Sequence, residues 1–169
     1  GIIKQHNGYI NVYSEKGIGT TFKIYLPLSK EEEEQYGGSE VMQKIEGGTE
    51  TILFAEDSPD VRESTVHLLK EFGYRVIEAY DGEDAIEKFK LNKDEIQLVI
   101  LDIVMPKKNG MEVYEEIKKE VPEVKVIFTS GYSEDVISKK LVAEKGYEII
   151  QKPLSPSHLL KRIKDILNK

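Results

Sequence analysis

The chain has 169 residues, a formal net charge of −7 at pH 7 and no cysteine. This length accommodates one ordinary domain plus an appendage. The negative charge argues against a general nucleic-acid-binding protein, since such proteins neutralise phosphates with basic side chains. Without cysteine there is no disulfide, thiolate nucleophile or cysteine-based metal site. No apolar run approaches the roughly 20 residues of a membrane span, so we expect a cytoplasmic segment without membrane contact.

The first 28 residues predict a helix end followed by a β-hairpin. Residues 2–6 resemble the last turn of a helix that Asn7-Gly8 ends. Residues 9–14 and 20–26 alternate between apolar and polar side chains, as strands do, and a glycine turn joins them. A lone hairpin is marginal in water, so this region is too small to fold by itself.

Residues 29–49 change in character and predict an interdomain linker. They contain the charge run 30–34 and two glycine pairs, at 37–38 and 47–48. A solvated helix start is the alternative for the charge run. We therefore expect a small region over 1–28, a linker over 29–49 and a main domain over 50–169.

The main domain shows a strand–helix unit repeated five times. The expected strands cover 51–55, 75–79, 98–101, 124–128 and 148–150. The expected helices run to about residues 72, 91, 121, 145 and 167 and begin with Ser58-Pro59, Asp81-Gly82, Asn109-Gly110, Ser133 and Ser155-Pro156. Short parallel strands joined by right-handed crossovers predict an α/β fold with a doubly wound five-stranded parallel sheet.

Reactive side chains follow four of these strands. Glu56-Asp57 follows the first strand, Asp102 the third, Thr129 the fourth and Lys152-Pro153 the fifth. The carboxyl ends of the strands in an open parallel sheet line one crevice. We therefore expect three carboxylates, a hydroxyl and an ammonium to converge, a set that can hold a divalent metal and accept a phosphoryl group.

The acidic residues predict a Mg²⁺ site. Carboxylate oxygens suit Mg²⁺, which keeps several waters and takes few protein ligands. Asp57 and Asp102 are candidates for direct ligands, Glu56 for a direct or water-mediated ligand, and the backbone carbonyl of Val104 for a further ligand. The alternative is that acidic residues in strand–helix loops only cap helices.

Four strings in the main domain resemble the response-regulator receiver family of two-component signalling. They are Phe54-Ala-Glu-Asp-Ser-Pro-Asp60, Val99-Ile-Leu-Asp-Ile-Val-Met-Pro-Lys-Lys-Asn-Gly110, Phe128-Thr-Ser-Gly131 and Lys152-Pro153. The resemblance implies a flavodoxin-like fold over about residues 51–168. It also implies that Asp102 takes a phosphoryl group from a phosphohistidine, with Glu56 and Asp57 binding the metal. Thr129 would be the switch hydroxyl and Lys152 the phosphate contact, often before a cis proline.

The chain departs from the receiver pattern at the switch aromatic. Receivers commonly carry an aromatic residue three positions before the lysine, where this chain has Ile149. Tyr132 and Tyr147 are nearby candidates, although the spacing of Tyr147 does not allow a simple substitution. The usual coupling between threonine and aromatic residue is therefore open.

A second departure concerns the loss of the phosphoryl group. Val104 and Gly131 lie two positions after Asp102 and Thr129 respectively, and neither side chain can orient an attacking water. We predict slow self-dephosphorylation.

The first 27 residues are similar to the end of a histidine-kinase ATP-binding domain. The similarity rests on His6-Asn-Gly-Tyr-Ile10, Ser14-Glu-Lys-Gly-Ile-Gly-Thr-Thr-Phe22 and Leu26-Pro27, in that order. It implies the C-terminal piece of a hybrid histidine kinase that neither binds ATP nor phosphorylates histidine. His6 is not the phosphorylated histidine in this interpretation. The expected partners are the kinase core and a histidine phosphotransfer protein, reached by protein contact and not through nucleic acid.

Two other functions compete with a phosphoacceptor that catalyses only its own aspartyl phosphorylation. A phosphohydrolase of similar topology would use Asp102 as nucleophile, but it would need a second aspartate where Val104 stands. A binding-only pseudo-receiver is disfavoured by the intact set of Glu56, Asp57, Asp102 and Lys152.

Overall fold

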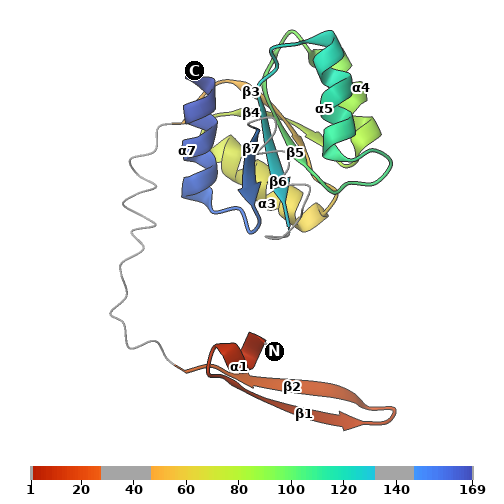
Figure 1. The fold of residues 1–169 in the computed structure, drawn as a ribbon, viewed down its shortest axis with the longest axis vertical. Helices are drawn as coiled ribbons and strands as arrows, with labels where there is room; N and C mark the ends of the chain where they lie inside the picture. Colours follow the sequence, from red (N-terminus) through yellow and green to blue (C-terminus); the bar gives the residue numbers. More distant parts are fainter. Residues whose placement is uncertain (1, 28–46, 132–146, 169) are drawn as a thin grey trace. The chain divides into compact units, whose positions relative to one another are not determined.

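The computed structural model describes residues 2–27, 47–131 and 147–168, in two compact units (Figure 1). The predicted fourth helix over 133–145, most of the predicted linker and Tyr132 lie outside the described residues.

The N-terminal unit is a short helix and a two-stranded antiparallel sheet. Helix α1 covers Ile2–Gln5, and strands β1 (Tyr9–Glu15) and β2 (Gly19–Tyr25) pair in register from Tyr9↔Tyr25 to Glu15↔Gly19. This confirms the predicted hairpin. The cross-strand pairs Ile10–Ile24 and Val12–Phe22 lie on the same face, and all four side chains are exposed within the described residues.

The second unit contains five parallel strands in the order β4-β3-β5-β6-β7. The strands are β3 (Thr51–Ala55), β4 (Arg75–Ala79), β5 (Ile96–Asp102), β6 (Val126–Ser130) and β7 (Glu148–Gln151). The helices are α3 (Pro59–Glu71), α4 (Gly82–Asn92), α5 (Gly110–Glu120) and α7 (Pro156–Leu167). The predicted doubly wound, flavodoxin-like fold is confirmed.

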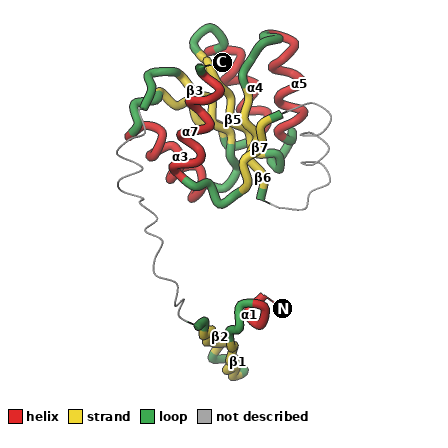
Figure 2. The backbone as a smooth tube through the Cα atoms, turned by 60° about the vertical axis from the view of Figure 1, so that its left-hand side comes forward, coloured by secondary structure: helices red, strands yellow, loops and turns green. Residues whose placement is uncertain are grey.

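Helices cover both faces of this sheet, so the strands are apolar on both sides. Helices α4 and α5 pack on one face through Phe89, Val113 and Ile117, while α3 and α7 pack on the other through Leu69 and Leu160 (Figure 2). Strand β3, which lies between β4 and β5, is buried along its whole length. This two-sided core fixes the strand ends that carry the reactive side chains.

The structure corrects the predicted ends of two strands. Strand β6 begins two residues later than predicted and includes Thr129, and Asp102 is the last residue of β5. In the parallel ladder Asp102 pairs directly with Thr129. The backbones of both residues are therefore placed by the sheet and not by a loop.

The predicted helix caps are only partly correct. Asp81 and Asn109 cap α4 and α5 with their side chains, and Asn109 forms a reciprocal capping box with Glu112. Ser58 and Ser155 occupy the cap positions of α3 and α7, but neither side chain makes a capping hydrogen bond. Each serine precedes a proline at the first helical position, where the missing N–H costs the helix no hydrogen bond.

Candidate functional site

The predicted site residues meet at the carboxyl edge of the sheet. Glu56 and Asp57 follow β3, Asp102 ends the adjacent β5, Thr129 lies on β6 and Lys152 follows β7. Strands β3, β5, β6 and β7 are consecutive neighbours in the sheet, so residues almost a hundred positions apart in sequence come together.

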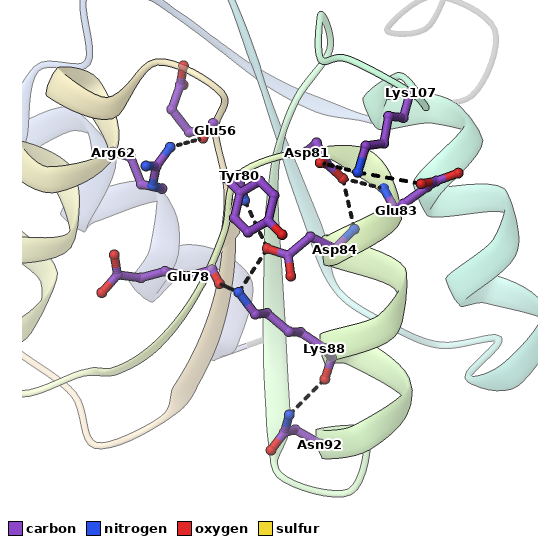
Figure 3. A network of polar contacts seen from close by, with 10 residues as sticks. All are labelled: Glu56, Arg62, Glu78, Tyr80, Asp81, Glu83, Asp84, Lys88, Asn92 and Lys107. Atoms are coloured by element: carbon purple, nitrogen blue, oxygen red, sulfur yellow. Dashed lines mark hydrogen bonds and ion pairs between the residues drawn. The ribbon is translucent and has the colours of Figure 1, made fainter.

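Three carboxylates form a compact acidic cluster. Glu56, Asp57 and Asp102 each offer one oxygen, and these oxygens all lie within 4.8 Å of one another. Glu56 and Asp102 are buried, whereas Asp57 is exposed. Arg62 on α3 fixes the backbone of the cluster because its Nη1 donates to the carbonyl oxygen of Glu56 at 2.8 Å (Figure 3). The cluster is thus a set of hard oxygen donors with one side open to solvent.

The Lys152 ammonium lies between the two buried carboxylates. Its Nζ is 2.7 Å from Asp102 Oδ2, as a hydrogen bond and ion pair, and 2.5 Å from Glu56 Oε2, as an ion pair. Burial raises the pKa of Glu56, and Lys152 offsets only part of that rise. Burial disfavours the charged form of Lys152, but its two carboxylate partners outweigh burial and raise its pKa. The lysine therefore stays cationic and partly neutralises the acidic cluster.

Backbone contacts position Asp102 and Lys152. The amide of Val104 donates to Asp102 Oδ1 at 3.2 Å, and the amide of Lys152 donates to the Ser130 carbonyl at 2.8 Å. The Lys152-Pro153 peptide bond is cis, as expected from the resemblance. Both oxygens of Asp102 are thereby held, one by an amide and the other by an ammonium.

Thr129 presents a free hydroxyl to this edge. The residue is fully buried, and among the described residues its Oγ1 has no hydrogen-bond partner. A buried hydroxyl without a partner is costly. The Thr129 hydroxyl would therefore gain from a hydrogen-bond acceptor at this edge.

Gly110 allows the loop after Asp102 to pass close to the strand. A Cβ at Gly110 would lie 2.3 Å from the Asp102 carbonyl oxygen. Val104, in the same loop, is 63% exposed, and Gly131 after β6 is also exposed. No polar side chain stands at either of these two positions beside Asp102 and Thr129.

The fold and this edge define a parallel α/β domain with an acidic, lysine-bridged site. The chain belongs to the response regulator receiver domain family, whose match covers residues 52–164. It is therefore a receiver domain of two-component systems. Receiver domains generally bind Mg²⁺ at an acidic cluster of this kind.

The chain is similar in sequence and in structure to known proteins with receiver domains. Sensor kinase CckA of Brucella abortus (strain 2308) is 38% identical over 176 aligned residues, which include the whole of this chain and 19% of that protein. The crystal structure of the receiver domain from hybrid histidine kinase CckA is 32% identical, with a TM-score of 0.59 over 69% of this chain and 98% of that chain. A receiver domain protein from Clostridium thermocellum has 30% identity and a TM-score of 0.65, over 70% and 94% of the two chains. The chain thus spans about one-fifth of the sensor kinase that it matches.

The residues present fit a divalent cation. Carboxylate oxygens are the ligands that Mg²⁺ prefers, and the exposed side of Asp57 leaves room for the waters that Mg²⁺ retains. Burial raises the pKa of Glu56 although Lys152 lies beside it, so a further positive charge here would favour the carboxylate. A cation at this cluster would provide it.

Tyr147 occupies the core region near the predicted switch aromatic. Its ring makes edge contacts with Tyr114 and Phe128, at centroid separations of 5.1 Å and 5.6 Å. Ile149, at the usual aromatic position, is partly buried and packs against the same core. Tyr147 is thus a ring in the core beside Phe128, and Tyr132, the other candidate, lies outside the described residues.

Sequence reasoning missed the contacts that Arg62, Asp81 and Lys107 make around this edge. Arg62 lies one turn into α3, and its hydrogen bond to the Glu56 carbonyl depends on the conformation of the loop after β3. Asp81 was expected to start a helix, which it does, but it also pairs with Lys107 in the loop after Asp102. Nothing in the sequence pairs these two positions, because their proximity depends on the sheet order.

Proposed function

We propose that this chain accepts a phosphoryl group from a phosphohistidine on Asp102, with Mg²⁺, as part of a hybrid sensor histidine kinase. The observation that carries the proposal is the placement of the buried Asp102 carboxylate. It lies within the acidic cluster and also within hydrogen-bonding distance of Lys152. A nucleophilic carboxylate beside a metal site and an ammonium suits phosphoryl transfer.

The proposed reaction balances in a single displacement. One Asp102 oxygen forms a P–O bond while the P–N bond of the phosphohistidine breaks, and the bonding pair leaves with the imidazole nitrogen. Lys152 remains protonated, because its pKa is raised, and its ammonium offsets negative charge on the phosphoryl oxygens. Mg²⁺ held by Glu56, Asp57, Asp102 and the Val104 carbonyl would supply further positive charge for the phosphoryl group.

Thr129 is the proposed switch residue. Its buried hydroxyl has no hydrogen-bond partner among the described residues, and its strand position is paired with Asp102. An acyl phosphate on Asp102 would offer oxygen acceptors to this hydroxyl. Formation of that hydrogen bond would remove an unsatisfied buried group, so phosphorylation would favour the conformation in which Thr129 reaches the phosphate.

Residues before the receiver domain support the proposal that this chain is part of a hybrid kinase. The alignment with sensor kinase CckA extends over the whole chain, including residues before the receiver match at 52. The exposed apolar face of the β1–β2 hairpin suits a piece of a larger domain. We therefore propose a histidine-kinase remnant over 1–28, a linker over 29–49 and the receiver over 50–169.

Partners and location follow from that context as proposals. Receiver domains of hybrid kinases interact with kinase or phosphotransfer proteins in general. For this chain we propose the kinase core as donor and a histidine phosphotransfer protein as a further partner. None of the helices in the described part of the chain is long and apolar enough to cross a membrane. The cytoplasmic location expected from the sequence stays a prediction.

Intact-mass spectrometry tests the proposal. The chain is incubated with Mg²⁺ and acetyl phosphate, beside Asp102→Asn and a sample with excess chelator. We expect one added phosphoryl group in the wild type and none in either control. A folded wild-type protein that gains no phosphoryl group, from acetyl phosphate or from a phosphorylated histidine kinase core, would favour the pseudo-receiver alternative.

A further inference from the structure

The loop between β5 and α5, residues 103–109, contains a strained turn. Lys107 has a φ of 64°, and the Lys108 amide donates to the Pro106 carbonyl at 2.7 Å. This is a γ-turn with its central residue at positive φ, a rare and strained form. A residue with a side chain keeps such a conformation only where surrounding contacts hold it. The same loop begins with Ile103 and Val104, directly after the proposed phosphoacceptor.

A buried carboxylate on another element holds the central lysine of this turn. Lys107 Nζ lies 2.8 Å from Asp81 Oδ2 and 3.5 Å from Glu83 Oε2 (Figure 3). The other Asp81 oxygen, Oδ1, accepts the amides of Glu83 and Asp84, both at 2.9 Å. One carboxylate therefore caps α4 and binds the loop at the same time.

Charge and burial favour this pair at neutral pH. The hydrogen bond with Asp81 raises the pKa of Lys107. Burial would raise the pKa of Asp81, but the two amides and Lys107 outweigh burial and lower it. Both partners are therefore ionised around pH 7, and the buried position of Asp81 protects the contact from full solvent screening.

The backbones of α4 and the loop are also in close contact. The Gly82 amide donates to the Pro106 carbonyl at 3.3 Å, and a Cβ at Gly82 would lie 2.1 Å from the Lys108 carbonyl oxygen. Glycine at this position is what allows the turn to lie against the first residue of α4. The Asp81–Lys107 ion pair thus adds a side-chain contact to two backbones that already lie close together.

Helix α4 is in turn joined to the end of β4, which contacts the backbone of Glu56. Asp84 Oδ2 accepts the Tyr80 amide at 3.1 Å and pairs with Lys88 at 2.8 Å. The next residue back, Ala79, accepts the Glu56 amide at 3.1 Å. The start of α4 therefore contacts the β5–α5 loop directly and is joined to Glu56 through the end of β4.

We propose that the Asp81–Lys107 ion pair is a positioning contact for the phosphoacceptor site. It holds the β5–α5 loop against α4 in the conformation that keeps the Val104 backbone beside Asp102. The observed contact from the Val104 amide to Asp102 Oδ1, at 3.2 Å, is the part of the site that this loop controls directly. The proposal rests on the proposed function, since Val104 is also the expected carbonyl ligand of Mg²⁺. Neither Asp81 nor Lys107 belongs to the acidic cluster of Glu56, Asp57 and Asp102, so their proposed role is indirect.

Titration calorimetry with MgCl₂ on the full chain tests this proposal without any phosphodonor. We compare the wild type with Asp81→Asn, which keeps a capping oxygen for α4 but removes the charge. Lys107→Ala removes the ammonium, Lys107→Arg keeps a cation, and Lys93→Ala removes an exposed lysine whose partner is Glu120 on α5. Thermal unfolding followed by circular dichroism confirms that each variant is folded.

We expect Asp81→Asn and Lys107→Ala each to raise the Kd for Mg²⁺ by about 3- to 10-fold, below the ~10- to 100-fold typical of groups bonded directly to a metal ligand. The double variant should be no weaker than the weaker single variant, because both changes break one contact. Lys107→Arg should restore most of the affinity, and Lys93→Ala should leave it unchanged.

A kinetic readout separates positioning from general destabilisation. In Lys107→Ala the Mg²⁺ concentration for half-maximal phosphorylation by acetyl phosphate should rise, while the rate at saturating Mg²⁺ stays close to the wild-type rate. Wild-type Mg²⁺ affinity in folded single variants, or fully additive effects in the double variant, would overturn the proposal. Failure of the wild type to take up phosphate, with Mg²⁺ binding weakened as expected in the variants, would instead count against the proposed function alone.

Discussion

Lys152 Nζ lies 2.5 Å from Glu56 Oε2 and 2.7 Å from Asp102 Oδ2, so one ammonium bridges two buried carboxylates from different strands. This arrangement gives the lysine two roles. It is a counter-charge for the acidic cluster in the protein alone, and it is the proposed phosphate contact in the reaction. The two roles can be separated by experiment.

Replacement of Lys152 should expose the first role. Lys152→Met leaves Glu56 and Asp102 buried without their cation, so the metal-free protein should lose about 2–4 kcal/mol in its free energy of unfolding. Urea titrations with chelator and with Mg²⁺ measure this. We expect Mg²⁺ to stabilise Lys152→Met more than the wild type, because the metal replaces the lost charge.

The matched control for this experiment is Lys93→Met. Lys93 pairs with Glu120 at 3.2 Å, and both side chains are 41% exposed. Exposed pairs are worth about 0–1 kcal/mol. Equal Mg²⁺ stabilisation of the wild type and Lys152→Met would contradict the counter-charge role.

The raised pKa of Glu56 makes stability depend on pH in a defined direction. A carboxyl with a raised folded-state pKa stabilises the fold below its unfolded pKa, and that contribution is lost as pH rises through the folded pKa. In metal-free protein, the stability of the wild type relative to Glu56→Gln should therefore fall as pH increases above about 4.5. With Mg²⁺ near pH 7 the wild type should instead be more stable than Glu56→Gln, since only the carboxylate is a good ligand. A pH-independent difference without metal would contradict the assigned direction.

Thr129→Val separates stability from function. The Oγ1 hydroxyl is buried without a partner among the described residues, so an apolar group of the same shape should be neutral or stabilising by up to about 1 kcal/mol. If Thr129 is the switch residue, the variant should still be phosphorylated but should lose the phosphorylation-dependent change in amide chemical shifts beyond the site. If phosphorylated Thr129→Val still shows all of the wild-type changes in amide chemical shift, Thr129 is not the switch residue.

Val104→Asn should accelerate loss of the phosphoryl group. Val104 is 63% exposed two residues after Asp102, and its apolar side chain cannot orient a water. An amide at this position could, and we expect the dephosphorylation rate to rise by about 3- to 10-fold. The rate is followed by intact mass after removal of the phosphodonor, with Val104→Leu as the apolar control. No acceleration in Val104→Asn would count against the proposed cause of a long phosphoryl lifetime.

Gly110→Ala should destabilise the fold through a backbone clash. The new Cβ would lie 2.3 Å from the Asp102 carbonyl oxygen, and we expect a loss of about 2–3 kcal/mol in unfolding free energy. Gly131→Ala is the matched control, because no atom of the described residues, apart from its chain neighbours, lies within 4 Å of its Cβ position. It should change stability by less than about 0.5 kcal/mol. Similar effects of the two substitutions in urea titrations would show that the close approach at Gly110 is unimportant.

The fold was predictable because its signals are local. Fully apolar strands such as Leu98–Leu101, and helix starts such as Asp81-Gly82 and Asn109-Gly110, predict strand–helix repeats directly. The convergence of Asp57, Asp102 and Lys152 then follows from the rule that parallel strands end at one edge. The serine caps were wrong because side-chain hydrogen bonds depend on local geometry that residue type alone does not fix.

Contacts between elements could not be predicted in the same way. The position of Lys152 between Glu56 and Asp102 depends on side-chain directions at three strand ends. The Asp81–Lys107 pair depends on a lysine at positive φ, which its residue type disfavours. The sequence predicts which groups come to this edge, but packing decides which of them touch.

The most direct test of the central claim is to locate the phosphoryl group after transfer from acetyl phosphate or from a phosphorylated kinase core. An acyl phosphate is cleaved by hydroxylamine and is reduced by borohydride, which converts the modified aspartate to homoserine. Peptide mapping then reads the position. We predict homoserine at Asp102 only, with none in Asp102→Asn or in chelator. Modification at Asp57 or at a histidine, with Asp102 unmodified, would contradict the account.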